Sequence, residues 1–198
     1  QFLAAVHVIV YAGAIIVFLF VYGLTATSVT FFIFLITFIK YRDPSEEIRK
    51  KGMKNLRKPL ISCIFAVRNE EKVVKQCMLS LIKSTYPNKE IIVVNDASTD
   101  KTREVLEQFR KYPEVKILNL KENVGKKKAI GQGLRIAKGE IFVFTDSDSV
   151  VANDAIERIV EVFMNDPMVG AVSGHGRALN AEENFLTRIQ DSWYETQF

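Results

Sequence analysis

Two aspartates directly follow an apolar run late in the sequence. Asp146 and Asp148 stand one residue apart after residues 142–145, which read Phe-Val-Phe-Thr. Alternate side chains of an extended chain project to the same side, so the two carboxylates are expected to lie together. Neighbouring carboxylates repel each other unless a cation lies between them, and Mg²⁺ and Mn²⁺ prefer such oxygen ligands with phosphates completing the shell. The spacing predicts a metal–diphosphate site; the plain alternative is a solvated acidic turn.

Short apolar runs alternate with helical patterns from residue 60 onward. Helices are expected after each of the first four runs, because apolar residues there recur at helical spacing. This order predicts an α/β fold of the Rossmann-like kind, with a mostly parallel sheet and helices on both faces. Asp100 and Asn153 are expected to cap two of the helices. The predicted strands are residues 60–66, 90–95, 115–120 and 140–145, with a fifth at 169–173.

The residues with chemical potential follow the ends of these strands. Arg68 and Glu70 follow the first strand, Asp96 follows the second, and Asp146 and Asp148 follow the fourth. Ligands of open α/β sheets bind beyond the carboxyl ends of the strands, so these side chains are expected to share one site. The sequence contains neither a Gly-x-Gly-x-x-Gly fingerprint after the first strand nor a Walker loop, which argues against a dinucleotide-binding site.

The amino-terminal segment has the composition of a membrane segment. Residues 1–39 contain no Asp, Glu, Lys or Arg, and the run exceeds the roughly 20 residues that span a bilayer. Because residues 23–28 are less apolar, two transmembrane helices are favoured over one long tilted helix; a buried pair of core helices is the alternative. The expected organisation is a membrane segment (1–40), a basic juxtamembrane linker (41–58) and a soluble domain (59–198).

Positive charge is concentrated just after the apolar segment, and most of the net charge of +4 arises there. Basic flanks mark the cytoplasmic side of a membrane span and attract anionic headgroups. Tyr41 is the single aromatic residue of the patch, so membrane lipids and not nucleic acid are the expected partners. The only two cysteines, Cys63 and Cys77, fall on apolar positions, as reduced cytosolic thiols do. The chain is expected to be an integral membrane protein with a cytoplasmic catalytic domain.

Four motifs of the soluble part stand in a characteristic order and spacing: Ala66-Val67-Arg68-Asn69-Glu70, Asn95-Asp96-Ala97-Ser98-Thr99-Asp100, Asn123-Val124-Gly125-Lys126 and Thr145-Asp146-Ser147-Asp148. Together they resemble glycosyltransferase family 2, the inverting nucleotide-sugar transferases of GT-A fold. The resemblance covers about residues 59–198. Residues 169–174 and 184–195 are further similar to membrane-bound processive synthases of hyaluronan, chitin oligosaccharides and poly-N-acetylglucosamine.

The resemblance implies contacts to the nucleoside of a UDP-sugar. The backbone of Ala66 would approach the uracil, Asp96 would accept a hydrogen bond from the uracil ring N–H, and Glu70 would lie near the ribose. Arg68 stands where relatives often have an aromatic residue, and its guanidinium can stack on a ring.

The resemblance also implies contacts to the diphosphate. Lys126 would bring positive charge near the phosphates, although a solvated lysine face is the alternative reading. Asp146 would lie at the ribose–diphosphate end. Asp148 would ligate Mg²⁺ or Mn²⁺.

The implied reaction is metal-dependent transfer of a sugar, of the N-acetylglucosamine type, from a UDP-sugar to a growing polysaccharide with inversion. Two alternatives are single-sugar transfer to a lipid carrier and a non-catalytic membrane module that binds a nucleotide sugar. The acidic motif that supplies the family's general base, and the Gln-x-x-Arg-Trp motif after it, are not found, so the base is expected beyond Phe198. The sequence is thus expected to be the donor-binding fragment of a longer enzyme.

One more helix is predicted near the end of the sequence. Asn180 and Glu183 have the spacing of a capping box, and Phe185, Leu186, Ile189 and Trp193 form an apolar stripe after them. The stripe is expected to pack on the sheet or to lie at the membrane interface.

Overall fold

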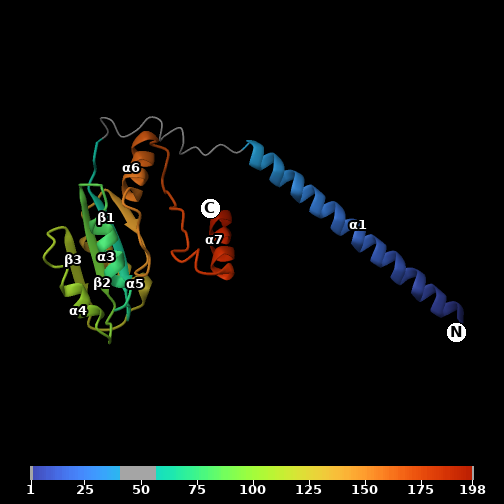
Figure 1. Ribbon diagram of the computed structural model, residues 1–198, viewed down its shortest axis with the longest axis horizontal. Coiled ribbons are helices and arrows are strands. Elements are labelled where there is room, and N and C mark those ends of the chain that lie inside the picture. Colours follow the sequence, from blue (N-terminus) through green and yellow to red (C-terminus); the bar gives the residue numbers. More distant parts are fainter. Residues whose placement is uncertain (1, 41–56, 198) are drawn as a thin grey trace. The chain divides into compact units, whose positions relative to one another are not determined.

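The computed structural model describes residues 2–40 and 57–197 and divides the chain into two compact units, Gln1–Glu47 and Ile48–Phe198 (Figure 1). The described part of the first unit is one helix, α1 (Phe2–Lys40). Its section Tyr11–Lys40 has the length and composition of a membrane span, with a mean hydropathy of 2.1.

The continuity of α1 corrects the prediction of two helices. The less apolar interval at residues 23–28 does not break the helix, because its hydroxyls bond to the preceding helical turn. Thr25 Oγ1 donates to the carbonyl of Val21 at 3.0 Å, and Ser28 Oγ donates to that of Leu24 at 2.8 Å. Hydroxyls that bond back in this way satisfy themselves inside an apolar helix. The predicted basic linker lies outside the described residues except for Arg57 and Lys58.

The second unit is built on a four-stranded parallel sheet, as the sequence predicted. The strand order is β3-β2-β1-β4 (Figure 1). β1 and β2 pair along their whole length, from Ile61 opposite Lys89 to Val67 opposite Asn95. The strands are β1 (Ile61–Val67), β2 (Lys89–Asn95), β3 (Val115–Asn119) and β4 (Ile141–Phe144).

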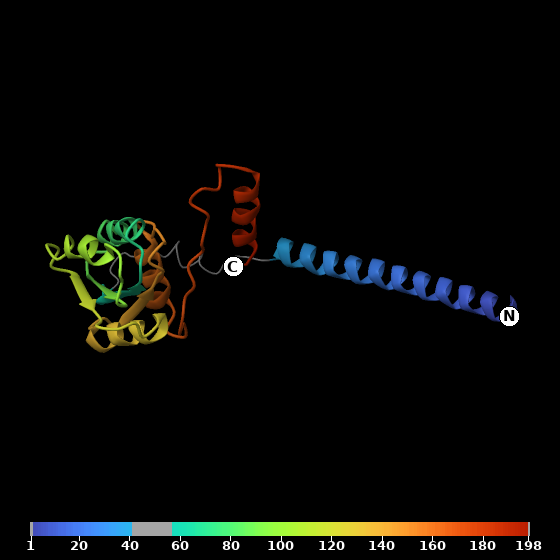
Figure 2. The same ribbon diagram turned by 90° about the horizontal axis from the view of Figure 1, so that it is seen from below.

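Helices cover both faces of the sheet, which confirms the predicted layers. α3 (Val74–Ile82), α4 (Thr102–Glu107) and α6 (Ala155–Asn165) pack on one face through a shared apolar cluster. α5 (Lys126–Ile136) packs on the opposite face (Figure 2). The helix lies so close to the strands that a Cβ at Gly133 would come within 2.8 Å of Ile64 Cγ2, which explains the glycine at this position.

The predicted fifth strand is not formed. Residues 169–173 have no strand pairing in the structure. Gly170 and Ser173 interrupt the run, and glycine and serine lack the branched or aromatic side chains that favour a pleated strand.

Of the three predicted helix caps, Asp100, Asn153 and Asn180, only Asp100 bonds to the start of its helix. Asp100 does act near a helix start, because its Oδ1 accepts from the N–H of Thr102 at 2.9 Å. Asn153 does not: Asp154 precedes α6 without a side-chain cap, and the Asn153 carbonyl instead accepts from the N–H of Thr85.

The last helix, α7 (Phe185–Gln197), begins later than Asn180. Asn184 Oδ1 accepts from the N–H groups of Leu186 and Thr187 at 3.0 and 3.1 Å, so the cap lies one turn beyond the predicted one. The apolar stripe of α7 is exposed in the structure and not packed on the sheet, with Phe185 75% and Trp193 63% accessible.

Candidate functional site

The carboxyl ends of the strands place the predicted residues around one pocket. β1 and β2 end side by side, and the N–H of Asp96 donates to the carbonyl of Val67 at 2.9 Å. β4 runs parallel to β1, with Phe144 opposite Ile64, and delivers the acidic turn to the same edge of the sheet. The pocket has a volume of about 380 Å³. All seven predicted residues line it: Ala66, Arg68, Glu70, Asp96, Lys126, Asp146 and Asp148.

Asp96 joins the second strand to the start of α5. The residue is only 3% exposed, and its two carboxylate oxygens accept from the N–H groups of Val124 at 2.8 Å and Gly125 at 2.9 Å. A carboxylate oxygen has two lone-pair directions, so each retains acceptor capacity toward the pocket. Gly125 has φ 85°, a left-handed conformation that glycine adopts without a steric penalty. Asp96 therefore shapes the pocket as well as lining it.

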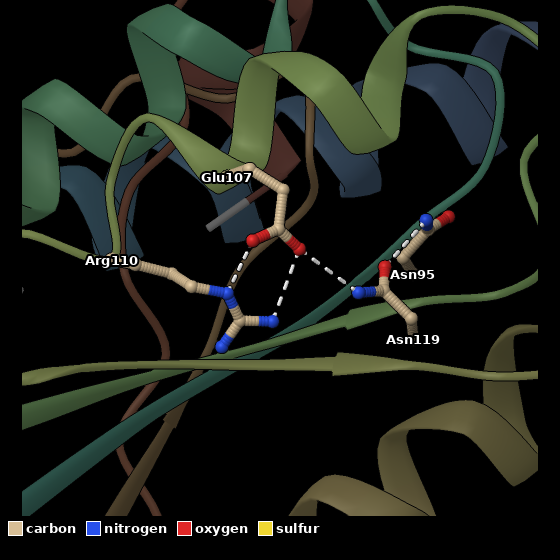
Figure 3. Close-up of polar contacts among 4 residues, drawn as sticks. All are labelled: Asn95, Glu107, Arg110 and Asn119. Atoms are coloured by element: carbon tan, nitrogen blue, oxygen red, sulfur yellow. Dashed lines mark hydrogen bonds and ion pairs between the residues drawn. The ribbon is translucent and has the colours of Figure 1, made fainter.

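The strand that presents Asp96 is fixed by a polar network behind it (Figure 3). Asn95 Nδ2 donates to Asn119 Oδ1 at 2.9 Å, across the register pair that ends β2 and β3. Asn119 Nδ2 in turn donates to Glu107 Oε1 at 3.2 Å, and Arg110 makes two further contacts with the same carboxylate. The hydrogen bond from Arg110 lowers the pKa of Glu107, so the carboxylate stays charged and keeps the network assembled.

The loops after β1 and β2 are bonded to each other. The N–H of Glu70 donates to Thr102 Oγ1 at 2.8 Å, and the N–H of Asn69 donates to Ser98 Oγ at 3.1 Å. In the opposite direction, Asn69 Oδ1 accepts from the N–H of Thr99 at 2.8 Å. These bonds fix the wall of the pocket that contains Arg68 and Glu70.

Lys126 and Asp146 form an ion pair across the mouth of the pocket. Lys126 Nζ lies 2.5 Å from Asp146 Oδ1, and both side chains are 59% exposed. Lys126 is the first residue of α5, so its ammonium group and the positive end of the helix dipole are together at one wall. This wall is suited to an anion such as a phosphate.

The acidic turn has the donor set of a site that shares a cation with a ligand. Asp146 and Asp148 both line the pocket, and no third His, Cys, Asp or Glu joins them in a metal-binding group among the described residues. Mg²⁺ is commonly bound by one or two carboxylates together with substrate phosphates and waters. The residues present therefore fit a divalent ion that is completed by a diphosphate.

A buried thiol lies beneath this turn. Cys77 Sγ donates to the carbonyl of Asp146 at 3.4 Å. Burial, together with the negative charges of Asp148 and Asp146, raises the pKa of the Cys77 thiol to about 12, so the group stays protonated as a donor. Cys77 and Cys63 are both free and buried, as predicted.

The pocket also contains residues that were not predicted. Asn123 and Gly125 line it, and Asn123 Oδ1 accepts from the N–H of Gly125 at 3.0 Å. Both stand in the same motif as Lys126, which was the signal available for them. The hydrogen bond from the Cys77 thiol to the carbonyl of Asp146 could not be predicted from the sequence, because Cys77 falls on the apolar face of a predicted helix.

Asp191 does not line the pocket. Its carboxylate accepts from Arg177 at 2.7 Å and from the N–H of Ala178 at 2.8 Å. The hydrogen bond from Arg177 lowers the pKa of Asp191. The residue ties α7 to the segment before it.

Solved structures share this architecture. The mannosyltransferase PcManGT from Pyrobaculum calidifontis, in complex with GDP-Man and Mn²⁺, is 28% identical with a TM-score of 0.57, over 69% of this chain and 43% of its own. TarS from S. aureus is 24% identical with a TM-score of 0.50, over 61% of this chain and 39% of its own, which is a likeness of fold.

Sequence relatives are polysaccharide synthases. The poly-beta-1,6-N-acetyl-D-glucosamine synthase of Staphylococcus epidermidis is 36% identical over 134 residues, and that of Staphylococcus aureus (strain COL) is 32% identical. Each alignment covers 68% of this chain and 32% of the relative, so the chain spans about a third of the length of these curated relatives. Residues 62–196 match the profile described as Glycosyl transferase family 2, and the chain belongs to that family.

Proposed function

We propose that this chain binds the donor of an inverting glycosyltransferase that moves a sugar, of the N-acetylglucosamine type, from a UDP-sugar to a growing polysaccharide with Mg²⁺ or Mn²⁺. The observation that carries the proposal is the pocket, where side chains from four loops converge in a member of glycosyltransferase family 2. The names of the Staphylococcus relatives support the sugar and the polymeric acceptor. The GDP-Man and Mn²⁺ bound to the Pyrobaculum enzyme support a sugar nucleotide together with a divalent ion.

In this proposal each wall of the pocket binds one part of the donor. Asp96 accepts from the uracil ring, Glu70 lies near the ribose, and Arg68 stacks on the base. Lys126 and the start of α5 face the phosphates, so positive charge lies where the leaving diphosphate becomes more negative. Asp146 and Asp148 would hold Mg²⁺ or Mn²⁺, which supplies further compensation for that charge.

Inversion requires direct displacement at the anomeric carbon by an acceptor hydroxyl, whose proton passes to a carboxylate base. Glu70, Asp96, Asp146 and Asp148 are all assigned to the donor. The general base is therefore expected in a part of the protein that corresponds to the two thirds of the Staphylococcus relative's length that this chain does not span.

The metal assignment is tested with Asp148→Asn in the full-length protein. Asparagine keeps the size of the side chain but removes the negative charge that favours a divalent ion. UDP affinity should lose its dependence on Mn²⁺ in calorimetric titrations, while the thermal unfolding temperature stays unchanged. Asp154→Asn is the matched control, because Asp154 is an exposed acid that pairs with Arg158 outside the pocket. Equal Mn²⁺ dependence in Asp148→Asn and wild type would contradict the assignment.

The reaction is tested with radiolabelled UDP-N-acetylglucosamine and membranes that contain the full-length protein. A ladder of labelled polymer is the expected product. A single lipid-linked product would replace the polymeric acceptor by a lipid carrier, and nucleotide binding without transfer would indicate a non-catalytic module.

A further inference from the structure

The loop that contains Asp146 and Asp148 is bonded along its length to α3 and the turn after it. Cys77 Sγ donates to the carbonyl of Asp146 at 3.4 Å. Ser80 Oγ accepts from the N–H of Val151 at 3.1 Å. The N–H of Thr85 donates to the carbonyl of Asn153 at 2.8 Å. Three contacts from one stretch of chain therefore span residues 146–153.

Cys77 and Ser80 act together because they lie three residues apart and so share one face of α3. Ser80 Oγ also donates to the carbonyl of Cys77 at 2.7 Å, which commits its proton and leaves a lone pair for the N–H of Val151. Cys77 is 1% exposed and Ser80 is 7% exposed, and neither lines the pocket.

The hydrogen bonds of Cys77 and Ser80 to the loop are made to backbone atoms, so they do not use the carboxylates of Asp146 and Asp148. The carbonyl of Asp146 also accepts from the N–H of Ser149 at 3.2 Å, so the turn between the two aspartates is closed on itself and fixed to α3. Two carboxylates in one turn repel each other, and a turn without external bonds would relax to separate them. A turn whose backbone is fixed beforehand limits how far the two side chains can move apart before a shared cation binds.

We infer that Cys77 and Ser80 are positioning residues that hold the acidic turn in its cation-binding geometry from beneath. The inference rests on the proposed function for the identity of the ligand, and on the three backbone contacts for the mechanism. Both residues are buried and do not line the pocket, so they would act on the cation through the loop.

The first test compares the UDP dissociation constants measured without and with Mn²⁺ in the full-length protein. In Ser80→Ala and Cys77→Ala this ratio should fall about fivefold, the factor that corresponds to one neutral hydrogen bond. Affinity for uridine without metal should stay unchanged, because Asp96 and Glu70 are held by other contacts. Cys77→Ser retains a donor and should restore most of the ratio.

The matched controls are Ser84→Ala and Cys63→Ala. Ser84 is also 7% exposed and bonds to the N–H of Tyr86, and Cys63 is a fully buried thiol of β1. These variants should lose comparable stability but keep the wild-type ratio. An equal fall in the controls would reduce the effect to general destabilisation and overturn the inference.

The second test is amide hydrogen exchange, which needs no ligand. The amides of Val151 and Ser149 should exchange about tenfold faster or more in Ser80→Ala than in Ser84→Ala, while amides of β1 and β2 exchange at equal rates. Equal exchange rates of these two amides in Ser80→Ala and Ser84→Ala would overturn the inference that Ser80 holds the acidic turn. If the wild-type protein shows no Mn²⁺-dependent UDP binding, the proposed metal function fails. The exchange rates alone then decide whether Cys77 and Ser80 hold the acidic turn.

Discussion

At the scale of single residues, Asp96 combines two tasks that usually belong to different side chains. Its carboxylate bonds to the N–H groups of Val124 and Gly125 and also lines the pocket. A substitution should therefore affect both folding and nucleoside binding. The two effects separate because only one of them requires a ligand.

Asp96→Ala should weaken uridine binding even without metal. It should also lower the free energy of unfolding by about 1–3 kcal/mol, because the hydrogen bonds from the N–H groups of Val124 and Gly125 to a charged carboxylate are lost. Calorimetry with uridine and chemical denaturation of the full-length protein measure the two effects. Asp154→Ala, a control outside the pocket, should leave uridine affinity unchanged and cost only its pair with Arg158, about 0.3–0.5 kcal/mol. Unaltered uridine affinity in a folded Asp96→Ala protein would remove Asp96 from the donor site.

The neighbouring residue, Ala97, lies in the left-handed region with φ 52°. This conformation costs a residue with a Cβ roughly 1–2 kcal/mol, and glycine avoids the cost but loses more entropy on folding. Ala97→Gly is therefore expected to raise the free energy of unfolding by about 0.5–1 kcal/mol in denaturant titrations.

Asn69 provides the comparison, because it has nearly the same φ of 54°. Its Oδ1 accepts from the N–H of Thr99, so Asn69→Gly should destabilise the protein although the backbone strain is relieved in the same way. Destabilisation by Ala97→Gly would show that the left-handed backbone at this position is not strained.

At the scale of elements, the end of the sheet opposite the pocket is fixed by one buried carboxylate. Glu90 of β2 accepts from Ser62 Oγ at 2.5 Å, from Lys116 Nζ at 2.5 Å and from the N–H of Lys138 at 2.6 Å. Burial alone would raise the pKa of Glu90, but the hydrogen bonds and the charge of Lys116 outweigh it and lower the pKa below its ordinary value of 4.5. β1, β2, β3 and the loop before β4 thus meet at a single charge.

This network predicts a loss of stability in acid. Because the pKa of Glu90 is lower in the folded than in the unfolded protein, its contribution is complete above pH 4.5 and is lost as the pH falls through the folded value. Glu90→Gln should cost about 1–3 kcal/mol at pH 7, because the amide group presents donors to Lys116.

Thermal unfolding measured from pH 7 down to pH 3 checks this prediction. The difference between wild type and Glu90→Gln should shrink below pH 4.5, where wild-type Glu90 takes up a proton. Glu114→Gln is the control on the loop before β3. A difference that stays constant across the titration would contradict a charged Glu90 in the folded protein.

At the scale of the whole molecule, the sequence was most informative where side-chain type and strand order act together. Apolar runs gave the four strands, and the rule that ligands bind at strand ends brought Asp96 and Asp146 to one pocket. Predictions failed where local pattern was the only guide. Thr25 and Ser28 suggested a break between two helices, but their hydroxyls bond to carbonyls within α1. Asn180 was predicted to cap the last helix, but Asn184 accepts the capping hydrogen bond. The hydrogen bond from the N–H of Val151 to Ser80 Oγ could not be predicted from the sequence, because a serine on an apolar helix face indicates no particular partner.

The charge distribution of the chain predicts its orientation in a membrane. Eight basic residues stand between residues 40 and 58 against three acidic ones, and α1 before them has the composition of a span. Positive flanks stay on the cytoplasmic side, so the soluble unit is expected there together with its two free thiols.

Protease digestion of sealed membrane vesicles tests this orientation. In inverted vesicles trypsin should remove the soluble unit, because basic side chains such as Lys127 and Lys128 are exposed on it. In right-side-out vesicles the same unit should survive until detergent opens the membrane. Digestion in sealed right-side-out vesicles would place the donor pocket on the outer face, where the positive flank could not have set the topology.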